Sequence, residues 1–213
     1  MNIYPLKIIK EPLEIRDFSD VHASLLSLSS WVEDFLGNTN ELLGREGPTC
    51  PYTRKSMKDD LLWFTVISED YSIDKLFSHV QELKNWFIKR ELKDEKFEEF
   101  RAVISVYTGL TDAALKIKSL QINSKSDFVK EGLMVGEFFP GCDTPGLWNT
   151  NFRPLDSPIS MIAIRNMVQT DLAFLRDTEE YFKAWLSKFP IPNTKQKCIF
   201  EEAKIKFNIC TTL

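Results

Sequence analysis

The chain of 213 residues has little of what several common enzyme classes require. Histidine occurs only at His22 and His79, although a serine or cysteine nucleophile usually needs an adjacent base. The four cysteines form no Cys-x-x-Cys pair, which argues against a structural zinc site. No GxGxxG, Walker A, HExxH or GxSxG motif is present. These absences disfavour dinucleotide-binding, P-loop, zincin and α/β-hydrolase chemistry.

Charge and hydropathy give no sign of a nucleic-acid or membrane partner. The formal net charge is −4 and the sequence pI is near 5.4, so no basic surface is indicated. No apolar run approaches the roughly 18 residues that span a bilayer, and the first residues do not resemble a secretory signal. We expect a cytoplasmic protein with reduced thiols. Its hydrophobic fraction of 43% predicts an ordinary packed core.

Hydrophobic periodicity predicts the elements of one α+β domain over 1–213. Helices are expected at 20–36, 73–89, 111–121, 170–188 and 194–207, with a helical turn at 126–131. Strands are expected at 61–67, 101–107, 133–138 and 159–164. The predicted fold is a mostly antiparallel four-stranded sheet with helices packed on one face. A helical segment (1–40) precedes it, and a tail or helix (190–213) follows.

The longest irregular segment, 136–154, is the first candidate for a functional site. It contains three prolines, three glycines and Trp148, and it lies between two predicted strands. So long a loop is uncommon in a compact domain unless it is functional or disordered. Its aromatic and apolar content argues against disorder. Trp148 is therefore predicted either to wall an apolar ligand pocket or to pin the loop.

Cys50 lies in a second loop, just before the first predicted strand. Proline follows it, and Arg45, Arg54 and Lys55 are close in sequence. Basic neighbours favour a reactive thiol, so Cys50 is a candidate nucleophile, redox thiol or haem ligand. The alternative, of about equal weight, is a small buried hydrophobe in a tight turn.

Arg153 and Arg165 are candidate anion-binding residues. Arg153 stands at the exit of the long loop, and Arg165 ends an apolar β-rich run. A guanidinium in either place can fork onto a carboxylate, propionate or phosphate. An internal salt bridge that holds the loop is an equally weighted interpretation. His22 and His79 are predicted to be structural or exposed rather than catalytic.

Four blocks of the sequence resemble an uncharacterised bacterial family of unknown function. They are Gly47–Tyr52, Gly132–Pro140, Pro145–Pro158 and Ala163–Leu175. The members of that family sit among biosynthetic and other accessory genes. The resemblance implies a role in specialised metabolism and supplies no established activity.

The chain also distantly resembles the haem-dependent guanidine N-hydroxylases. The likeness lies in a cysteine-containing loop before the first strand and in a Phe-x-Pro segment before a loop. Where relatives of this chain often have histidine, it has Phe139 and Asn166. The resemblance implies a haem whose ligand is Cys50, His22 or His79, with Arg153 or Arg165 on a propionate. Phe139 and Asn166 would then contact the ligand.

Three functional hypotheses result. The first is a small-molecule-modifying enzyme, in one version a haem-dependent oxygenase, with its site between the Cys50 loop and the 138–156 loop. The second is a non-catalytic ligand-binding or regulatory module that lost its catalytic histidines. The third is a redox or transfer enzyme that uses Cys50. A homo-oligomer is a further expectation, because an open antiparallel sheet exposes its edges.

Overall fold

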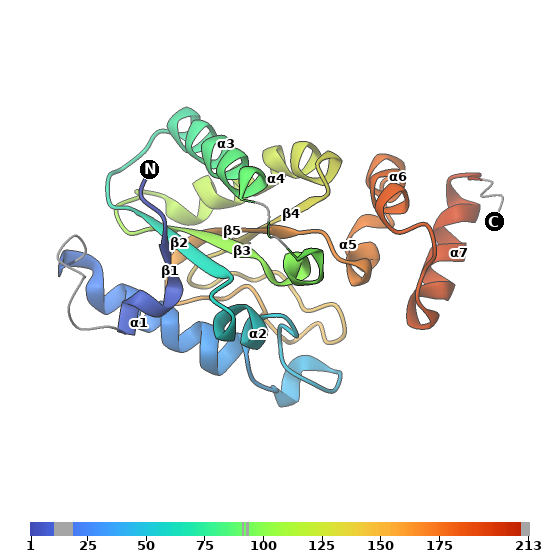
Figure 1. Cartoon of the computed structure of the whole chain (residues 1–213), viewed down its shortest axis with the longest axis horizontal. Coiled ribbons are helices and arrows are strands. Elements are labelled where there is room, and N and C mark those ends of the chain that lie inside the picture. The colour runs from blue at the N-terminus through green and yellow to red at the C-terminus, as the bar shows by residue number, and fades with distance from the viewer. Residues whose placement is uncertain (11–18, 91, 93, 210–213) are drawn as a thin grey trace.

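The computed structural model describes residues 1–10, 19–90, 92 and 94–209, and shows one five-stranded sheet with helices around it (Figure 1). The strands are β1 (Tyr4–Pro5), β2 (Leu62–Ile67), β3 (Ala102–Tyr107), β4 (Leu133–Phe138) and β5 (Ser160–Asn166). Their order in the sheet is β1-β2-β3-β5-β4. β2 and β3 are parallel, and every other neighbouring pair is antiparallel.

The predicted α+β class is confirmed, but the predicted sheet is only partly right. All four predicted strands form within two residues of their expected bounds, and β4 and β5 pair antiparallel as expected. The two-residue strand β1 was too short to give a periodic signal. The parallel pairing of β2 with β3 follows from the long helix between them, because such a crossover returns the chain to the same end of the sheet.

The α-helices are α1 (His22–Trp31), α2 (Thr53–Lys58), α3 (Ile73–Lys89), α4 (Ala113–Lys130), α5 (Leu172–Leu175), α6 (Glu179–Lys188) and α7 (Lys197–Lys206). Short helical turns are η1 (Leu6–Lys10), η3 (Val32–Leu36), η4 (Glu41–Leu43), η5 (Glu95–Phe100), η6 (Gln169–Asp171) and η7 (Thr194–Gln196). The helix predicted at 111–121 and the turn at 126–131 are one helix, α4. The helix predicted at 170–188 is two, because the chain breaks between α5 and α6. Among the described helices, none is long and apolar enough to cross a membrane.

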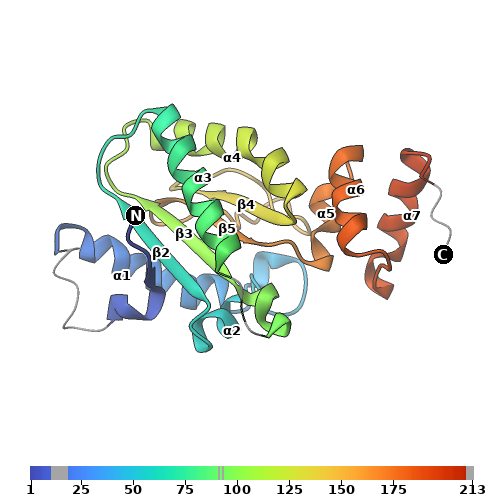
Figure 2. The ribbon, with the colours of Figure 1, turned by 45° about the horizontal axis from the view of Figure 1, so that its top comes forward.

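Helices cover both faces of the sheet, so the prediction of helices on one face is wrong. The upper face in Figure 2 carries α3 and α4, which pack on Trp63, Val103 and Ile164. The opposite face carries α1 and η1, which pack on Phe64 and Met161 among others. The central strands are apolar on both sides, and such strands require cover on both faces.

The last helices form a third cluster at one end of the sheet (Figure 1). Phe182 and Trp185 of α6 are fully buried there, together with Phe200 of α7 and Leu172 and Leu175 of α5. Trp185 Nε1 donates to the carbonyl oxygen of Gln169 at 3.0 Å. The predicted helix at 194–207 is thus present as η7 and α7, and residues 210–213 lie outside the described part of the chain.

The loops that leave the parallel strands β2 and β3 cross at Gly109. A β-carbon at Gly109 would lie 1.8 Å from the carbonyl oxygen of Ser68. Nearby, Asp70 accepts hydrogen bonds from the backbone and side chain of Thr111 and from Lys116 Nζ. The bonds from Lys116 and Thr111 lower the pKa of Asp70 to about 2. This crossing therefore requires glycine for close approach of two backbones.

We expect Gly109→Ala to lower the free energy of unfolding by about 3 kcal/mol or more, because one backbone must move away from the other. Gly141→Ala is the matched control. Gly141 has nothing within 4 Å of a β-carbon but a φ of 75°, so its substitution should cost only about 1 kcal/mol. Urea denaturation of both variants measures the difference. Equal costs would contradict the close packing at Gly109.

Candidate functional site

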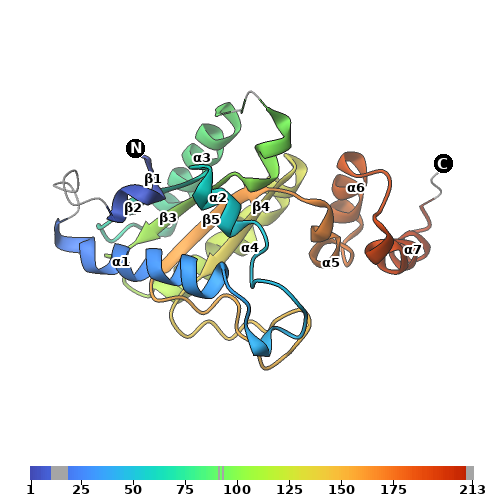
Figure 3. The same cartoon turned by 60° about the horizontal axis from the view of Figure 1, so that its bottom comes forward.

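The two irregular loops identified in the sequence lie side by side beneath the sheet (Figure 3). Asn149 Nδ2 donates to the carbonyl oxygen of Leu42 at 2.8 Å. Phe152 stacks on Phe35 with ring centroids 5.7 Å apart. Gly44 has a φ of 78°, and a β-carbon there would lie 3.0 Å from the Trp148 carbonyl oxygen. The two loops therefore brace each other.

Most predicted site residues of the long loop are used inside the fold. Arg153 Nη1 donates to the carbonyl oxygens of Thr150 and Phe152. Phe139 is buried in the cluster beneath α3 and α4, as is Cys142. Trp148 points outward, with 60% of its surface exposed. These side chains do not face one common pocket.

Arg165 lies at the end of β5 and is held by a buried carboxylate. Its Nη1 and Nη2 donate to the two oxygens of Asp171 at 2.7 and 2.6 Å. Asp171 is buried, and it also accepts from the backbone N–H of Val168 at 2.8 Å. The Arg165 side chain stays 30% exposed. The guanidinium is thus fixed in one orientation while part of it remains reachable.

Cys50 and Tyr52 lie close enough to Arg165 to interact with it electrostatically. Burial by itself would lower the pKa of the Arg165 guanidinium. The Asp171 carboxylate outweighs burial and raises this pKa, and Cys50 and Tyr52 add smaller contributions in the same direction. Burial also raises the pKa of Tyr52, so this phenol keeps its proton at neutral pH. The backbone N–H of Cys50 donates to the Leu36 carbonyl oxygen at 2.8 Å, which ties this turn to the helical segment before it.

The basic residues near Cys50 in sequence are engaged elsewhere. Arg45 donates to the carbonyl oxygens of Glu46 and Thr49. Arg54 donates to the side chain of Asn38, and Lys55 pairs with Asp59 at 2.6 Å. The cation beside Cys50 is Arg165, which is distant in sequence.

Asn166 projects to the other face of the sheet and joins a second polar group. Its Nδ2 donates to the backbone and side-chain oxygens of Glu98 at 2.7 and 2.9 Å. Glu98 pairs with Arg101 at 2.8 Å. Lys188 Nζ donates to the Gly132 carbonyl oxygen at 3.1 Å, and burial lowers the pKa of this lysine. Charged groups therefore surround the end of β5 on both faces.

Asp171, Tyr52 and Glu98 are site residues that sequence reasoning missed. Asp171 stands six positions after Arg165 in one of the blocks quoted above. The available signal was an acidic residue in the turn that follows a strand with an arginine near its end, a pattern that allows an ion pair between the two. Tyr52 and Glu98 gave none, because their approach to Arg165 and Asn166 depends on the tertiary fold.

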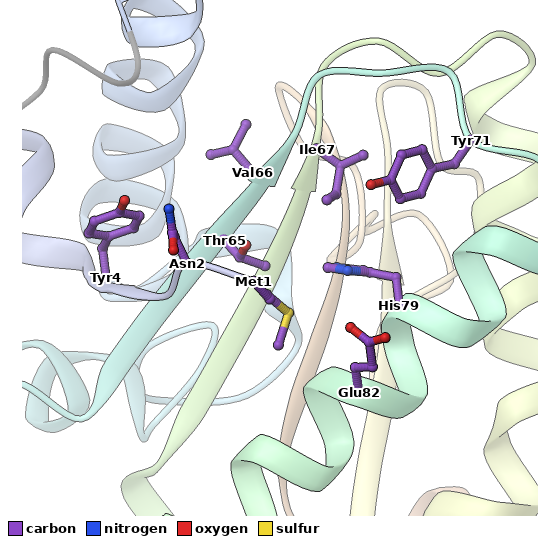
Figure 4. Close-up of a pocket in the computed structure, with 9 residues that line it drawn as sticks. All are labelled: Met1, Asn2, Tyr4, Thr65, Val66, Ile67, Tyr71, His79 and Glu82. Carbon is purple, nitrogen blue, oxygen red and sulfur yellow. The ribbon is translucent and has the colours of Figure 1, made fainter.

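His79 is buried on α3 and lies at the floor of a cavity of about 350 Å³ (Figure 4). Its Nε2 lies 2.8 Å from Ser105 Oγ. The rings of Tyr71 and Tyr107 pack edge-on against the imidazole. Burial lowers the pKa of His79, so the ring is neutral near pH 7. His22 is half-buried at the first position of α1.

The surroundings of two of the candidate haem ligands, His79 and Cys50, do not fit a haem. The cavity at His79 has Glu82 in its lining and no arginine or lysine that would hold a propionate. Cys50 lines neither that cavity nor the one of about 240 Å³ near Phe97. In the part of the chain that is described, no group of three or more His, Cys, Asp or Glu is placed to hold a metal ion.

Replacing Asp171 tests how much the ion pair contributes to the fold. We expect Asp171→Ala to reduce the free energy of unfolding by about 2–4 kcal/mol, because Arg165 and the Val168 N–H lose their partner. Glu180→Ala, which removes a solvent-exposed pair with Lys130, is the control and should cost much less. Urea unfolding of the two variants provides the comparison. A similar small loss in both would show that the buried pair is dispensable.

The depressed pKa of His79 makes stability depend on pH. As pH falls below the ordinary histidine pKa of about 6.5, the unfolded chain takes up a proton that the folded protein resists. Stability present above pH 6.5 is therefore lost on acidification. Between pH 7.5 and 5.5 the wild type should lose up to about 1.4 kcal/mol more than His79→Gln. Denaturation curves at both pH values measure this, and an equal loss in both proteins would refute it.

Comparison with known proteins assigns a family. No curated protein and no solved structure matches the chain. One family model matches residues 25–199, which include strands β2 to β5, the Cys50 loop, the long loop and most of the C-terminal helices. This protein therefore belongs to the family described as a domain of unknown function, DUF6875.

Proposed function

We propose that this protein is a small-molecule-modifying enzyme that acts on an anionic substrate where Cys50 meets Arg165. One arrangement carries the proposal: Asp171 fixes the orientation of Arg165, the Tyr52 hydroxyl lies 3.4 Å from Thr170 Oγ1 next to Asp171, and Cys50 lies near enough to influence the pKa of Arg165. A thiol, a protonated phenol and an oriented guanidinium then share one end of the sheet. Convergence of such groups is the usual sign of a reactive site.

Arg165 is suited to bind a carboxylate or a similar anion. Its Nη1 is fully used, by Asp171 and by the Asn166 carbonyl oxygen. Its Nη2 makes one hydrogen bond, and its Nε makes none with the described residues. Donors thus remain for a ligand on a group whose direction is already fixed, which reduces the entropy lost on binding.

Cys50 is suited to act as the nucleophile in a transfer reaction. Its thiol is free and partly exposed. In such a step the thiol would first lose its proton to water; the thiolate Sγ would then attack an electrophilic carbon of the substrate, and the leaving group would depart with the electron pair of the broken bond. Tyr52, protonated because burial raises its pKa, could donate a hydrogen bond to the leaving group.

A second candidate is a binding module without catalysis. It is favoured by the absence of a histidine base from this end of the described structure, since His79 is committed to Ser105. The second candidate is also favoured by Arg165, because the hydrogen bonds that it donates go to Asn166 and Asp171 within the protein. In that case Arg165 would hold an anionic ligand and Cys50 would perform no chemistry.

The charge beside Cys50 can be measured by alkylation with iodoacetate and with neutral iodoacetamide. Cys198 is the internal control, because it is exposed and its Sγ lies 3.5 Å from a Glu202 carboxylate oxygen. We expect the iodoacetate-to-iodoacetamide rate ratio to be at least about threefold higher at Cys50, since the guanidinium attracts the anion. Mass spectrometry of the two cysteine peptides gives the ratios. Added salt should reduce the difference.

Arg165 variants identify the source of that charge. Arg165→Lys should retain a raised ratio, whereas Arg165→Met should lower it to that of Cys198. Circular dichroism establishes that each variant is folded before its ratio is used. Equal iodoacetate-to-iodoacetamide rate ratios at Cys50 and Cys198 in the wild type would contradict the proposed site.

An activated ester separates the enzyme from the binding module. In mono-p-nitrophenyl succinate, attack by Cys50 Sγ on the ester carbonyl would release p-nitrophenolate and leave a succinyl group on the thiol. The enzyme hypothesis expects faster acylation of Cys50 than by p-nitrophenyl acetate, which lacks the carboxylate. Anion selectivity in alkylation without acylation of Cys50 would instead favour the binding module.

A further inference from the structure

The cavity at His79 lies at the opposite end of the sheet from Arg165. Arg165 pairs in register with Ala102, which pairs with Leu62 at the start of β2. The cavity is lined instead by Thr65 to Ile67 at the end of β2, beyond the two residues that pair with β1. It is therefore separate from the site proposed at Cys50, and nothing above assigns it a role.

Its position is one where open sheets commonly bind ligands. β2 and β3 are the parallel pair, and the cavity lies at the carboxyl end of β2. In open α/β sheets, small molecules bind outside the carboxyl ends of parallel strands. A volume of about 350 Å³ lies within the range of small-ligand sites.

The floor of the cavity is a buried set of polar groups. Thr65 and His79 are 2% and 7% exposed. His79 Nε2 lies 2.8 Å from Ser105 Oγ, at hydrogen-bond distance. His79 Nδ1 has no hydrogen-bond partner among the described residues. Behind them, the buried hydroxyl of Tyr107 approaches Ser105 without reaching hydrogen-bond geometry. Buried polar groups are normally satisfied, and of these groups the Tyr107 hydroxyl is buried without a partner, while His79 Nδ1 is open to water or to a ligand.

The rim of the cavity favours a positive charge. Glu82 lies one turn after His79 on α3 and is exposed, and no lysine or arginine of the described residues lines the cavity. The groups that act electrostatically on His79 are the Glu82 carboxylate and the Met1 amino group. An ammonium is thus already accommodated near the imidazole. An anionic ligand would meet an unpaired carboxylate.

The aromatic walls favour the same ligand class. Figure 4 shows the side chains of Tyr71 and His79 projecting in the same direction, with Ile67 beside Tyr71. Tyr71 already attracts a cation on its ring, since Lys75 Nζ lies 3.7 Å from the ring centroid. Carboxylate, phenol and neutral imidazole together are the groups that recognise an organic ammonium.

We propose that this cavity binds a small organic amine. Its ammonium lies between the Glu82 carboxylate and the His79 imidazole, and its apolar part packs on Ile67 and Tyr71. The Ser105 hydroxyl and the edge-packed ring of Tyr107 hold the imidazole in place from behind. The protein then has two small-molecule sites of opposite charge preference, at opposite ends of its sheet.

The test uses 2-phenylethylamine as the probe and proton NMR of the imidazoles as the readout. The chain has only two histidines, so a His22→Gln variant assigns both sets of ring signals. Titration should shift the His79 signals saturably and leave those of His22 in place. At equal concentration, 2-phenylethanol and 3-phenylpropionate, which match the probe in size but not in charge, should bind more weakly or not at all.

Two variants on one helix test the role of the carboxylate. Glu82→Gln should weaken binding by about two- to fivefold, as expected for an exposed ion pair. Asp74→Asn is the matched control, because Asp74 is also exposed on α3 but does not line the cavity. It should leave affinity unchanged. Both substitutions are on the surface, so we expect both variants to fold like the wild type.

Several results would overturn the proposal. The cavity would not be a binding site if the His79 signals showed no saturable shift, or if His22 shifted equally. The ligand class would be wrong if 2-phenylethanol bound as well as the amine. Equal affinity in Glu82→Gln and Asp74→Asn would remove the carboxylate from recognition.

Discussion

Arg165 ends β5 with its guanidinium locked on a carboxylate that is almost wholly buried, and the geometry of this end of the molecule depends on that pair. Asp171 belongs to the short turn that leads into α5, so the pair fixes the first of the C-terminal helices against the sheet. The same carboxylate accepts from the Val168 N–H and closes that turn. One carboxylate therefore sets both the path of the chain after β5 and the direction of the guanidinium.

A buried ion pair is a poor way to gain stability alone. Desolvating two charges costs several kcal/mol, and apolar replacements are often as stable. What the pair supplies here is orientation. Arg165 cannot swing away from Cys50 and Tyr52 without stranding Asp171. This matches a site in which a cation must be held in position for a ligand, and it explains why the guanidinium of a partly exposed arginine is fixed so firmly.

The sequence predicted the apolar elements well because their signals are local. β2, β3 and β5 are runs of apolar and β-branched residues, and α3 carries a clear helical stripe. What it could not predict are features that depend on packing between distant segments. The second helical layer over the sheet is one example, since α1 reads as an amphipathic helix without saying which face it covers. The proximity of Cys50 to Arg165 is another, because the two residues are far apart in sequence and only the fold brings them together.

The long loop packs against the segment before Cys50 and does not form the ligand pocket that its composition suggested. Its aromatic and proline-rich sequence predicted a ligand pocket, yet Phe152 stacks on Phe35 and Asn149 bonds to Leu42. These contacts fall on the segment that leads to Cys50, whose backbone N–H is itself tied to Leu36. The loop thus acts as a brace for the Cys50 turn, holding it against the sheet from below. A loop with this role needs rigid turns and flat apolar surfaces, which its prolines, Phe152 and the close approach at Gly44 provide. In the proposed site its contribution is then indirect, because it fixes the position of the turn that carries Cys50.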